Sequence, residues 1–235
     1  MRQFEDEYWW FVSRRRLALS LLQEFEPVGK VLDVGCGTGA VLAEIQKNRD
    51  AWGLDFSELA LDFGRERGLL NLVHGNAESL PFADGEFSAI VTLDTLEHVP
   101  DDVKAIAEIA RVLEPGGAAI INVPAFRWLW GPHDVALMHF RRYTKNELAD
   151  KLTAAGLEVQ WASYGVFFLF PVVVMIRVLD KLKKRDAEVD LPKVSPGFNR
   201  FLLKLMDFEA RLMRNIPLPW GSSVAAVAVK PLSKP

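Results

Sequence analysis

The chain has 235 residues, half of them hydrophobic and a quarter charged, with a formal net charge of −3. This length supports one substantial domain with its own core, and the slight acidity excludes a general electrostatic argument for binding nucleic acid. The single cysteine, Cys36, excludes an internal disulfide, and no uninterrupted apolar run reaches the about 18 residues expected of a spanning helix.

The first expected element is a helix or helix pair over residues 4–25, with apolar faces of aromatic and leucine side chains. The acidic segment at its start lacks the apolar core of a signal peptide, which with the lone cysteine predicts a cytoplasmic protein. Strands and helices then alternate. We expect strands at 30–34, 51–55, 70–74, 87–93, 117–123 and 157–164, helices at 40–47, 57–67, 101–113 and 145–155, and a last strand at 224–229.

Alternation of this kind predicts an α/β fold with parallel strands joined by crossover helices. Local signals set some of the boundaries. Thr144 with Glu147 forms a capping box at the start of one helix, Gly156 ends that helix, and Ser57 is a plausible N-cap. Residues 1–235 therefore read as one domain.

The most informative stretch is Val-Leu-Asp-Val-Gly-Cys-Gly-Thr-Gly at residues 31–39. An apolar strand carries an acid into a glycine-rich turn and then into a helix, which offers free N–H groups to a ligand. Gly35, Gly37 and Ala40 fit a dinucleotide fingerprint, and Asp55 lies where a ribose-binding acid is expected. Asp33, however, would repel a pyrophosphate and would suit a cationic ligand.

The string from Asp33 to Gly39 resembles the signature loop of class I S-adenosylmethionine (SAM)-dependent methyltransferases, in the small-molecule branch. The resemblance covers residues 28–160. It implies a Rossmann-like, doubly wound, mostly parallel sheet with an antiparallel last strand, and SAM as cofactor, with S-adenosylhomocysteine as product. The implied cofactor-binding residues lie in four successive stretches: Asp33, Gly35, Cys36, Gly37 and Gly39; Asp55 and Phe56; Asn76, Ala77 and Glu78; and Leu93.

The chemistry of several of these residues fits the implied cofactor. The Asp55 carboxylate can accept hydrogen bonds from both ribose hydroxyls. Asn76 stands where many family members have an aspartate, and its side-chain oxygen can still accept from an adenine amino group. Cys36 reads as a small buried residue of the loop rather than as a nucleophile.

The main departure from the family pattern is an insert of about fifty residues, 166–215, where a hairpin loop needs only about 2–5. It has ten basic and six acidic residues, against the acidic remainder of the chain. We expect two helical segments that border the acceptor pocket. In the second of them, residues Phe198, Phe201, Leu202, Leu205, Phe208 and Leu212 are predicted to share one apolar face. A membrane or lipid contact, a structural cap and a dimer interface all fit the insert.

Three of the four histidines, His98, His133 and His139, follow the fourth and fifth expected strands, at the edge where open α/β sheets bind ligands. Methyl transfer to a hydroxyl needs a group that removes a proton, so these three are the candidate catalytic residues. The polar and aromatic segment 126–143 is expected to bind the acceptor. The candidate substrate-binding residues are Trp9, Trp10, Trp130, Arg141, Arg142 and Tyr143.

A metal option follows from Glu97-His98 and His133-Asp134, since imidazole and carboxylate ligands suit several divalent ions. The glutamate–histidine pair is similar to that of some quinone-pathway O-methyltransferases. The ligand spacing is not diagnostic, and we predict no metal.

The sequence thus predicts one domain with an N-terminal helical lid (1–27), a SAM-binding core (28–165), a helical apolar insert (166–215) and a last strand with a tail (216–235). The predicted reaction is SAM-dependent methylation, at oxygen, of a small hydrophobic or lipid-linked acceptor, with no nucleic-acid partner and with peripheral membrane contact through the insert as an option. The alternatives are N- or C-methylation, an NAD-dependent oxidoreductase, which Asp33 disfavours, and a non-catalytic SAM-binding partner.

Overall fold

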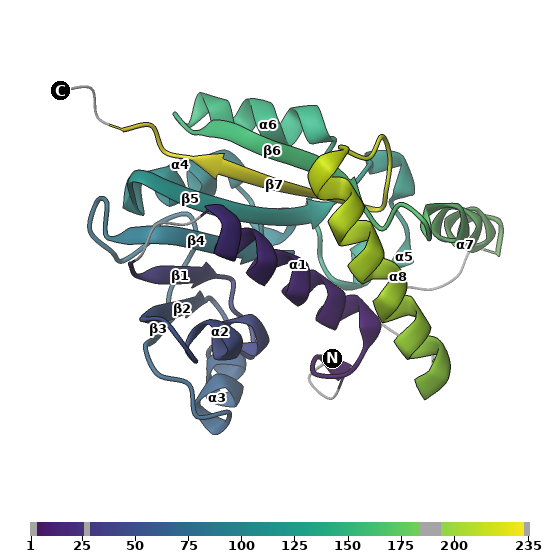
Figure 1. Ribbon diagram of the computed structural model, residues 1–235, viewed down its shortest axis with the longest axis horizontal. Coiled ribbons are helices and arrows are strands. Elements are labelled where there is room, and N and C mark those ends of the chain that lie inside the picture. Colours follow the sequence, from purple (N-terminus) through teal and green to yellow (C-terminus); the bar gives the residue numbers. More distant parts are fainter. Residues whose placement is uncertain (1–3, 26–28, 184–193, 233–235) are drawn as a thin grey trace.

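The computed structural model describes residues 4–25, 29–183 and 194–232. Its centre is a seven-stranded sheet in the order β3-β2-β1-β4-β5-β7-β6 (Figure 1). The strands are β1 (Val31–Val34), β2 (Ala51–Asp55), β3 (Leu72–His74), β4 (Phe87–Leu93), β5 (Leu113–Pro124), β6 (Glu158–Gly165) and β7 (Ser223–Val229). The first five pair in parallel, and β7 pairs antiparallel with both β5 and β6. The expected Rossmann-like sheet with an antiparallel last strand is confirmed.

The helices are α1 (Trp9–Phe25), α2 (Ala40–Ile45), α3 (Glu58–Glu66), α4 (Asp102–Val112), α5 (Pro132–Ala136), α6 (Lys145–Ala154), α7 (Phe170–Lys183) and α8 (Pro196–Asn215). Short 3-10 turns, η2 (Leu96–His98) and η3 (Arg127–Leu129), follow β4 and β5. The expected caps are present: Ser57 Oγ accepts from the Ala60 N–H, and Thr144 with Glu147 forms the capping box.

Alternate residues of the central strands pack on opposite faces of the sheet, as the side-chain period of a strand requires. Val31, with its neighbours on the same face, packs under α1 and α2, whereas Leu32 packs with α4 and α6 on the other face. Both faces are covered, so the strands read as nearly continuous apolar runs. The carboxyl ends of β1, β2, β4 and β5 therefore meet at one edge, where the connecting loops are free to build a site.

Helix α8 packs beside α1 in front of the sheet (Figure 1). The side chain of Asn199 in α8 accepts from the Trp9 N–H at 2.9 Å and donates to the Glu7 carbonyl at 2.9 Å. Arg16 of α1 and Asp207 of α8 form an exposed ion pair at 2.7 Å. The second helix of the insert is thus attached to the N-terminal lid, a contact between segments almost two hundred residues apart.

The apolar face predicted for the second insert helix is only partly the face of α8 that the domain covers. The side chains that face the core are Leu202, Met206, Glu209 and Met213, whereas Phe198, Phe201 and Phe208 are exposed. The apolar residues of α8 form two stripes on different sides of the helix, and only one stripe meets the domain. Residues 184–193 of the insert, and residues 1–3 and 26–27 of the lid, lie outside the described residues.

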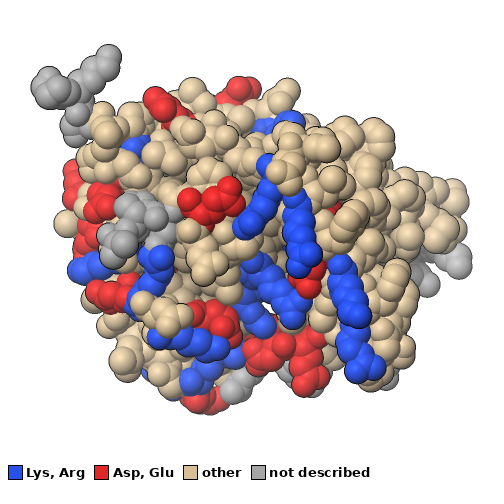
Figure 2. Space-filling view, in the orientation of Figure 1, with Lys and Arg blue, Asp and Glu red and all other residues tan. Residues whose placement is uncertain are grey.

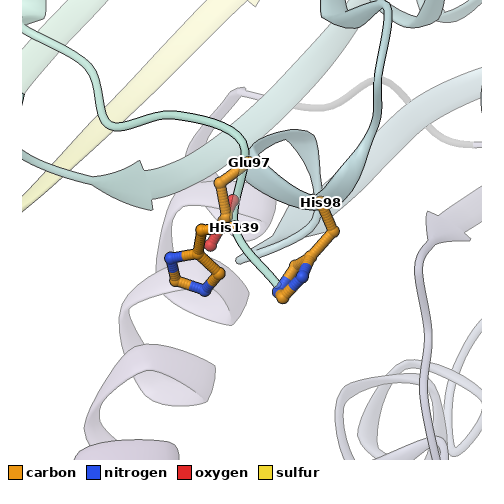
Figure 3. Close-up of side chains that lie close together, drawn as sticks. All are labelled: Glu97, His98 and His139. Carbon is orange, nitrogen blue, oxygen red and sulfur yellow. The ribbon is translucent and has the colours of Figure 1, made fainter. Parts of the chain in front are cut away.

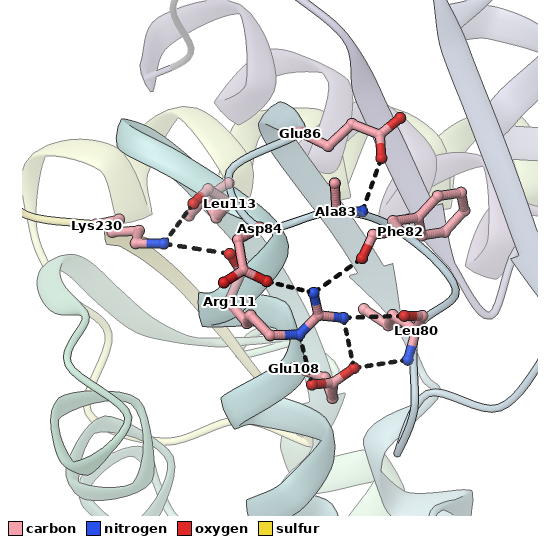
Figure 4. A network of polar contacts seen from close by, with 9 residues as sticks. All are labelled: Leu80, Phe82, Ala83, Asp84, Glu86, Glu108, Arg111, Leu113 and Lys230. Carbon is pink, nitrogen blue, oxygen red and sulfur yellow. Dashed lines mark hydrogen bonds and ion pairs between the residues drawn. The ribbon is translucent and has the colours of Figure 1, made fainter.

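Arg111 in α4 binds together the turn after β3 and the start of β4 (Figure 4). Its guanidinium donates to Glu108, Asp84 and the carbonyls of Leu80 and Phe82, at 2.7 to 2.9 Å. The hydrogen bonds to Glu108 and Asp84 raise the pKa of Arg111 further above its already high value. Residues 80–84 are therefore held against α4 by Arg111, which is a structural role.

The expected elements agree with the observed ones to within a few residues, with two differences. Strand β5 begins at Leu113, four residues before the expected start, because the Pro115-Gly116-Gly117 break is part of the strand. The polar segment 126–143 contains η3 and α5 rather than a plain loop. Among the described residues, no helix is both long enough and apolar enough to cross a membrane.

Glu209 provides a test of how the insert is anchored. Its buried carboxylate accepts from the backbone N–H groups of Val166 and Phe168, which lead into α7. Glu209→Ala should lower the free energy of unfolding by about 2 kcal/mol or more, because two buried donors lose their acceptor. Asp207→Ala, which removes an exposed ion pair on the same helix, should cost less than about 1 kcal/mol. Urea unfolding of both variants checks this, and equal losses would contradict it.

Candidate functional site

The site is built from the loops at the carboxyl ends of β1, β2, β4 and β5. The turn after β1 is held by Asp55 at the end of β2. One Asp55 oxygen accepts from the Gly37 N–H at 2.8 Å and the other accepts from the Ser57 N–H at 2.8 Å. A single carboxylate thus fixes both the glycine turn and the start of α3.

Gly35 and Gly37 have different reasons to be glycine. Gly35 has φ of 75°, and a Cβ there would overlap with the Thr95 side chain, so its lack of a side chain serves packing. Gly37 has φ of 55°, and a Cβ there would meet nothing within 4 Å. The backbone at Gly37 therefore faces open space, as a turn that approaches a ligand closely requires. Gly39, at the start of α2, has φ of 80°, and a Cβ there would overlap with the Leu69 side chain.

Asp33 at the end of β1 is 2% exposed. No hydrogen-bond donor among the described residues reaches its Oδ2 atom. Burial, and then the neighbouring Asp55 carboxylate, raise the pKa of Asp33 to about 7. A buried carboxylate without a counter-ion is costly, and a cationic ligand at the turn would remove that cost.

Cys36, between the two glycines, is buried, and burial raises the pKa of its thiol far above the ordinary value. The thiolate needed for nucleophilic chemistry is therefore not formed. This agrees with its reading as a small packing residue.

The remaining residues predicted to bind the cofactor follow β2 and β3 or end β4, at the same edge of the sheet. Phe56 is 80% exposed, so its ring is available as a stacking surface. Asn76 is exposed, and its side-chain oxygen accepts from the Glu78 N–H at 2.9 Å. Ala77 is buried and Leu93 is half-buried. The Asn76 oxygen already caps a turn, so an adenine group would share an occupied acceptor.

The N-terminal lid closes over this turn through charged contacts. Glu5 accepts from the Thr38 hydroxyl of the glycine turn and lies 3.5 Å from Arg67. Arg14 of α1 forms an ion pair with Asp94, the residue that follows β4. Asp94 has φ of 52°, an unusual conformation for a residue other than glycine. Sequence analysis did not single out this Arg14–Asp94 pair.

Three ionisable side chains converge after β4 and β5: Glu97, His98 and His139 (Figure 3). One nitrogen or oxygen atom of each side chain, of the kind that can bind a metal, lies within 4.8 Å of the other two. The two imidazole rings are edge to face, with centroids 4.6 Å apart. Burial raises the pKa of Glu97 to about 8. Burial and His139 lower the pKa of His98 to about 4.

His139 is oriented by a fully buried carboxylate, Asp134. The His139 Nδ1 atom lies 2.9 Å from Asp134 Oδ1, and Arg142 binds both Asp134 oxygens at 2.7 and 3.0 Å. Although burial opposes ionisation, the hydrogen bonds from His139 and Arg142 keep the pKa of Asp134 well below its usual value. With Nδ1 bound to Asp134, the Nε2 atom of His139 is left as the acceptor.

His133, the third predicted histidine, lies at the start of α5 beside the other two. Burial, and then the Arg177 guanidinium of α7, lower its pKa to about 4. Its imidazole is therefore neutral at physiological pH, as a proton acceptor must be.

Arg141, Arg142 and Tyr143 do not face a ligand. Arg141 donates to the carbonyls of Val99 and Pro100, both at 2.6 Å. Arg142 binds Asp134, and the Tyr143 hydroxyl is buried and donates to Asp102 at 2.9 Å. These donors are already used inside the domain, so we omit all three from the acceptor site.

The three predicted tryptophans, Trp9, Trp10 and Trp130, are all half-buried. Trp9 and Trp10 pack edge to face at the start of α1, and the Arg14 guanidinium lies 3.9 Å from the centre of the Trp10 ring. An aromatic cluster that sequence analysis missed joins the 126–130 segment to α7. Its members are Phe126, Trp128, Tyr164 and Phe170, with ring centroids 4.8 to 6.0 Å apart.

Glu97, His98 and His139 also form a donor set that suits a divalent transition ion. Within the described residues, no donor reaches the buried Glu97 Oε2. Two buried or nearly buried arginines, Arg14 and Arg142, lie close enough to Glu97 to influence its charge, and they disfavour a second cation. The charges around the cluster therefore favour a role in proton transfer over a metal site.

Comparison with known proteins agrees with this geometry. A model of the methyltransferase domain matches residues 32–121. A demethylmenaquinone methyltransferase of Bacillus cytotoxicus is 34% identical over 130 residues, which cover 51% of this chain and 55% of that protein. A probable S-adenosylmethionine-dependent methyltransferase of Mycolicibacterium smegmatis is 31% identical over 69% of this chain and 64% of that protein.

Among solved structures, phosphoethanolamine N-methyltransferase 2 of Haemonchus contortus, in complex with S-adenosyl-L-methionine, aligns with a TM-score of 0.58 and 18% identity. The alignment covers 92% of this chain and 52% of that one, and it supports the fold alone.

The chain spans 55% and 64% of the length of the two curated relatives. Fold, family match and named relatives nevertheless agree, and they confirm SAM as the cofactor. The glycine turn after β1, the acid at the end of β2 and the unmatched Asp33 are the features expected of a site for that cofactor. Residues 32–121 match the methyltransferase-domain family, and this match and the named relatives support a class I SAM-dependent methyltransferase.

Proposed function

We propose that the protein transfers a methyl group from SAM to a hydroxyl of a small hydrophobic or lipid-linked acceptor. The observation that carries the proposal is the convergence of Glu97, His98 and His139 at the sheet edge that holds the glycine turn. A sulfonium supplies the methyl group by in-line displacement, so the protein mainly positions the reactants and removes a proton from the acceptor.

Asp33, the 35–39 turn, Asp55, Phe56 and the 76–78 turn would hold the cofactor. Asp33 carries a buried carboxylate with one oxygen, Oδ2, that no donor of the described residues reaches, which fits the aminium or sulfonium charge of SAM. The same carboxylate disfavours the pyrophosphate of NAD, so an oxidoreductase is the weaker alternative. Asp55 already organises the turn and keeps lone pairs for the ribose hydroxyls.

His98 would act as the general base. Its ring is the exposed member of the cluster, whereas the side chain of His139 is only 6% exposed and Glu97 is buried behind them. Asp134 positions His139, and His139 in turn packs against His98. His133 is the second candidate. The lowered pKa of His98 and of His133 keeps both imidazoles neutral at physiological pH.

The acceptor would be apolar. The aromatic cluster of Phe126, Trp128, Tyr164 and Phe170 forms a wall between the histidine segment and α7. Trp9, Trp10 and Trp130 would contribute from the lid and the 126–130 segment. The demethylmenaquinone methyltransferase of B. cytotoxicus supports this choice, since its name describes a quinone as the acceptor. A lipid-linked acceptor would place the protein at the cytoplasmic surface of a membrane.

The first prediction concerns the cofactor contact of Asp55. Asp55→Ala should weaken SAM binding by roughly 1–3 kcal/mol, because the ribose loses a charged acceptor and the glycine turn loses its anchor. Titration calorimetry measures this. Asp62→Ala, which removes an exposed carboxylate of α3, is the control and should leave SAM affinity unchanged. An Asp55 variant with full affinity would contradict the assignment.

The second prediction is a pH dependence of SAM affinity that follows Asp33. Because burial raises the pKa of Asp33 to about 7, the carboxylate is mostly protonated below that pH and ionised above it. Cationic SAM favours the ionised form, so affinity should rise as pH increases through about 7, with release of a proton on binding. Calorimetry in buffers of different ionisation enthalpy measures both effects. Asp33→Asn should remove them, and an unchanged profile in that variant would exclude Asp33 as the group.

The third prediction concerns proton removal. His98→Ala should lower turnover by about 10²–10⁴-fold with SAM affinity unchanged. Val135→Ala, an exposed change in the neighbouring α5, serves as the control. A radiolabelled-methyl assay with hydrophobic quinol and phenol acceptors measures turnover. Full activity of the His98, His133 and His139 alanine variants would favour N- or C-methylation without a base. No transfer by the wild-type chain to any acceptor class would favour a non-catalytic SAM-binding role.

Loss of turnover on chelation, with recovery on addition of a divalent ion, would instead assign Glu97, His98 and His139 to a metal. The wild-type protein with and without chelator is sufficient for that comparison. Unchanged turnover after chelation would leave the proton-transfer assignment in place.

A further inference from the structure

Helix α7 carries an apolar stripe on its solvent side. The stripe consists of Val172, Met175, Ile176, Leu179 and Leu182, each between 43% and 75% exposed. These residues recur at spacings of three or four, which places them on one side of a helix. In a globular protein a stripe of this spacing normally faces the core.

The polar side of α7 faces the domain instead. The Arg177 guanidinium packs against Gly131, where an added Cβ would lie 3.0 Å from Arg177 Nη1. The Lys181 ammonium donates to the Trp128 carbonyl at 2.8 Å. These polar contacts and the ring contacts of Phe170 hold α7 on the domain, while an apolar stripe of the helix stays exposed.

Helix α8 adds a second exposed stripe, of aromatic residues. Phe198, Phe201 and Phe208 are between 53% and 56% exposed. The Phe208 ring lies 5.9 Å from that of Phe168, just before α7, which is itself 37% exposed. This contact places the α8 stripe next to the segment that leads into α7. We call the α7 stripe, Phe168 and the three α8 phenylalanines the docking face.

Basic side chains border the docking face along α8. Arg200, Lys204 and Arg211 are exposed. Lys204 follows Phe201 by three residues and precedes Phe208 by four, so these side chains are neighbours on the helix surface. Figure 2 shows Lys and Arg side chains over the region of α8, beside a largely uncharged projection at the end where α7 lies. Long cationic side chains beside an apolar face are typical of a helix that lies in a membrane interface.

We propose that the docking face binds the surface of an anionic lipid bilayer, with α7 and the aromatic side of α8 inserted among the lipid head groups. The choice of a bilayer rests in part on the proposed lipid-linked acceptor. Charge supports it independently, because the exposed Arg200, Lys204 and Arg211 beside the apolar face complement anionic head groups. Through Gly131 and Trp128, α7 contacts the segment that carries His133 and His139, so the bilayer would lie beside the acceptor edge.

The test is co-sedimentation with phosphatidylcholine vesicles, with and without phosphatidylglycerol. The wild-type chain should bind the anionic vesicles, and added salt should weaken that binding, since the charge attraction is screened. Met175→Glu with Leu179→Glu should reduce vesicle binding by about tenfold or more, and Arg200→Glu with Lys204→Glu should do the same on the anionic vesicles only. Leu59→Glu with Leu70→Glu, at exposed leucines 64% and 72% accessible away from the docking face, should have no effect.

Melting temperature and SAM affinity of each variant show whether the domain and its cofactor site are intact. A chain that binds vesicles but not SAM would overturn the proposed function and leave the docking face standing. A wild-type chain that binds neither vesicle, or docking-face variants that bind like the control variant, would overturn the inference. A wild-type dimer that dissociates in the Met175/Leu179 variant, without vesicle binding, would also overturn it and assign the face to a second copy.

Discussion

Burial of carboxylate groups at the carboxyl edge of the sheet is the constraint on which the site depends. Asp33, Glu97 and Asp134 are all nearly or fully inaccessible to water. Removing a charge from water is costly unless opposite charges or donors replace the lost hydration. Some of these carboxylates find their partners within the protein and have a structural role. Others keep an oxygen without a partner and are available to a ligand.

Asp134 is satisfied by the protein itself. Arg142, His139 and the Gly131 N–H supply its hydrogen bonds, and the resulting ion pair fixes the histidine segment on the domain. Asp33 and Glu97 each keep an oxygen that no donor of the described residues reaches, and burial raises the pKa of both. One lies under the glycine turn and the other beside the two histidines, the two places where we propose the cofactor end and the reacting end of one site.

Local signals in the sequence predicted the frame of this site well. Glycines, caps and apolar periodicity act over a few residues, so the glycine turn, the Ser57 cap and the Thr144–Glu147 box could be identified without a structure. The partners of Arg14 and Arg142 could not, because each pairs with an acid that tertiary folding brings to it. The packing of α8 could not be predicted for a related reason. Two apolar stripes share that helix, and periodicity does not reveal which one the domain covers.

The central claim is that the turn after β1 is built for a cationic cofactor and not for a dinucleotide phosphate. Parallel calorimetric titrations of the intact protein with SAM, S-adenosylhomocysteine and NADH test it most directly. The account predicts saturable binding of the two sulfur-containing nucleosides and none of NADH. Tight binding of NADH with no binding of SAM would contradict it.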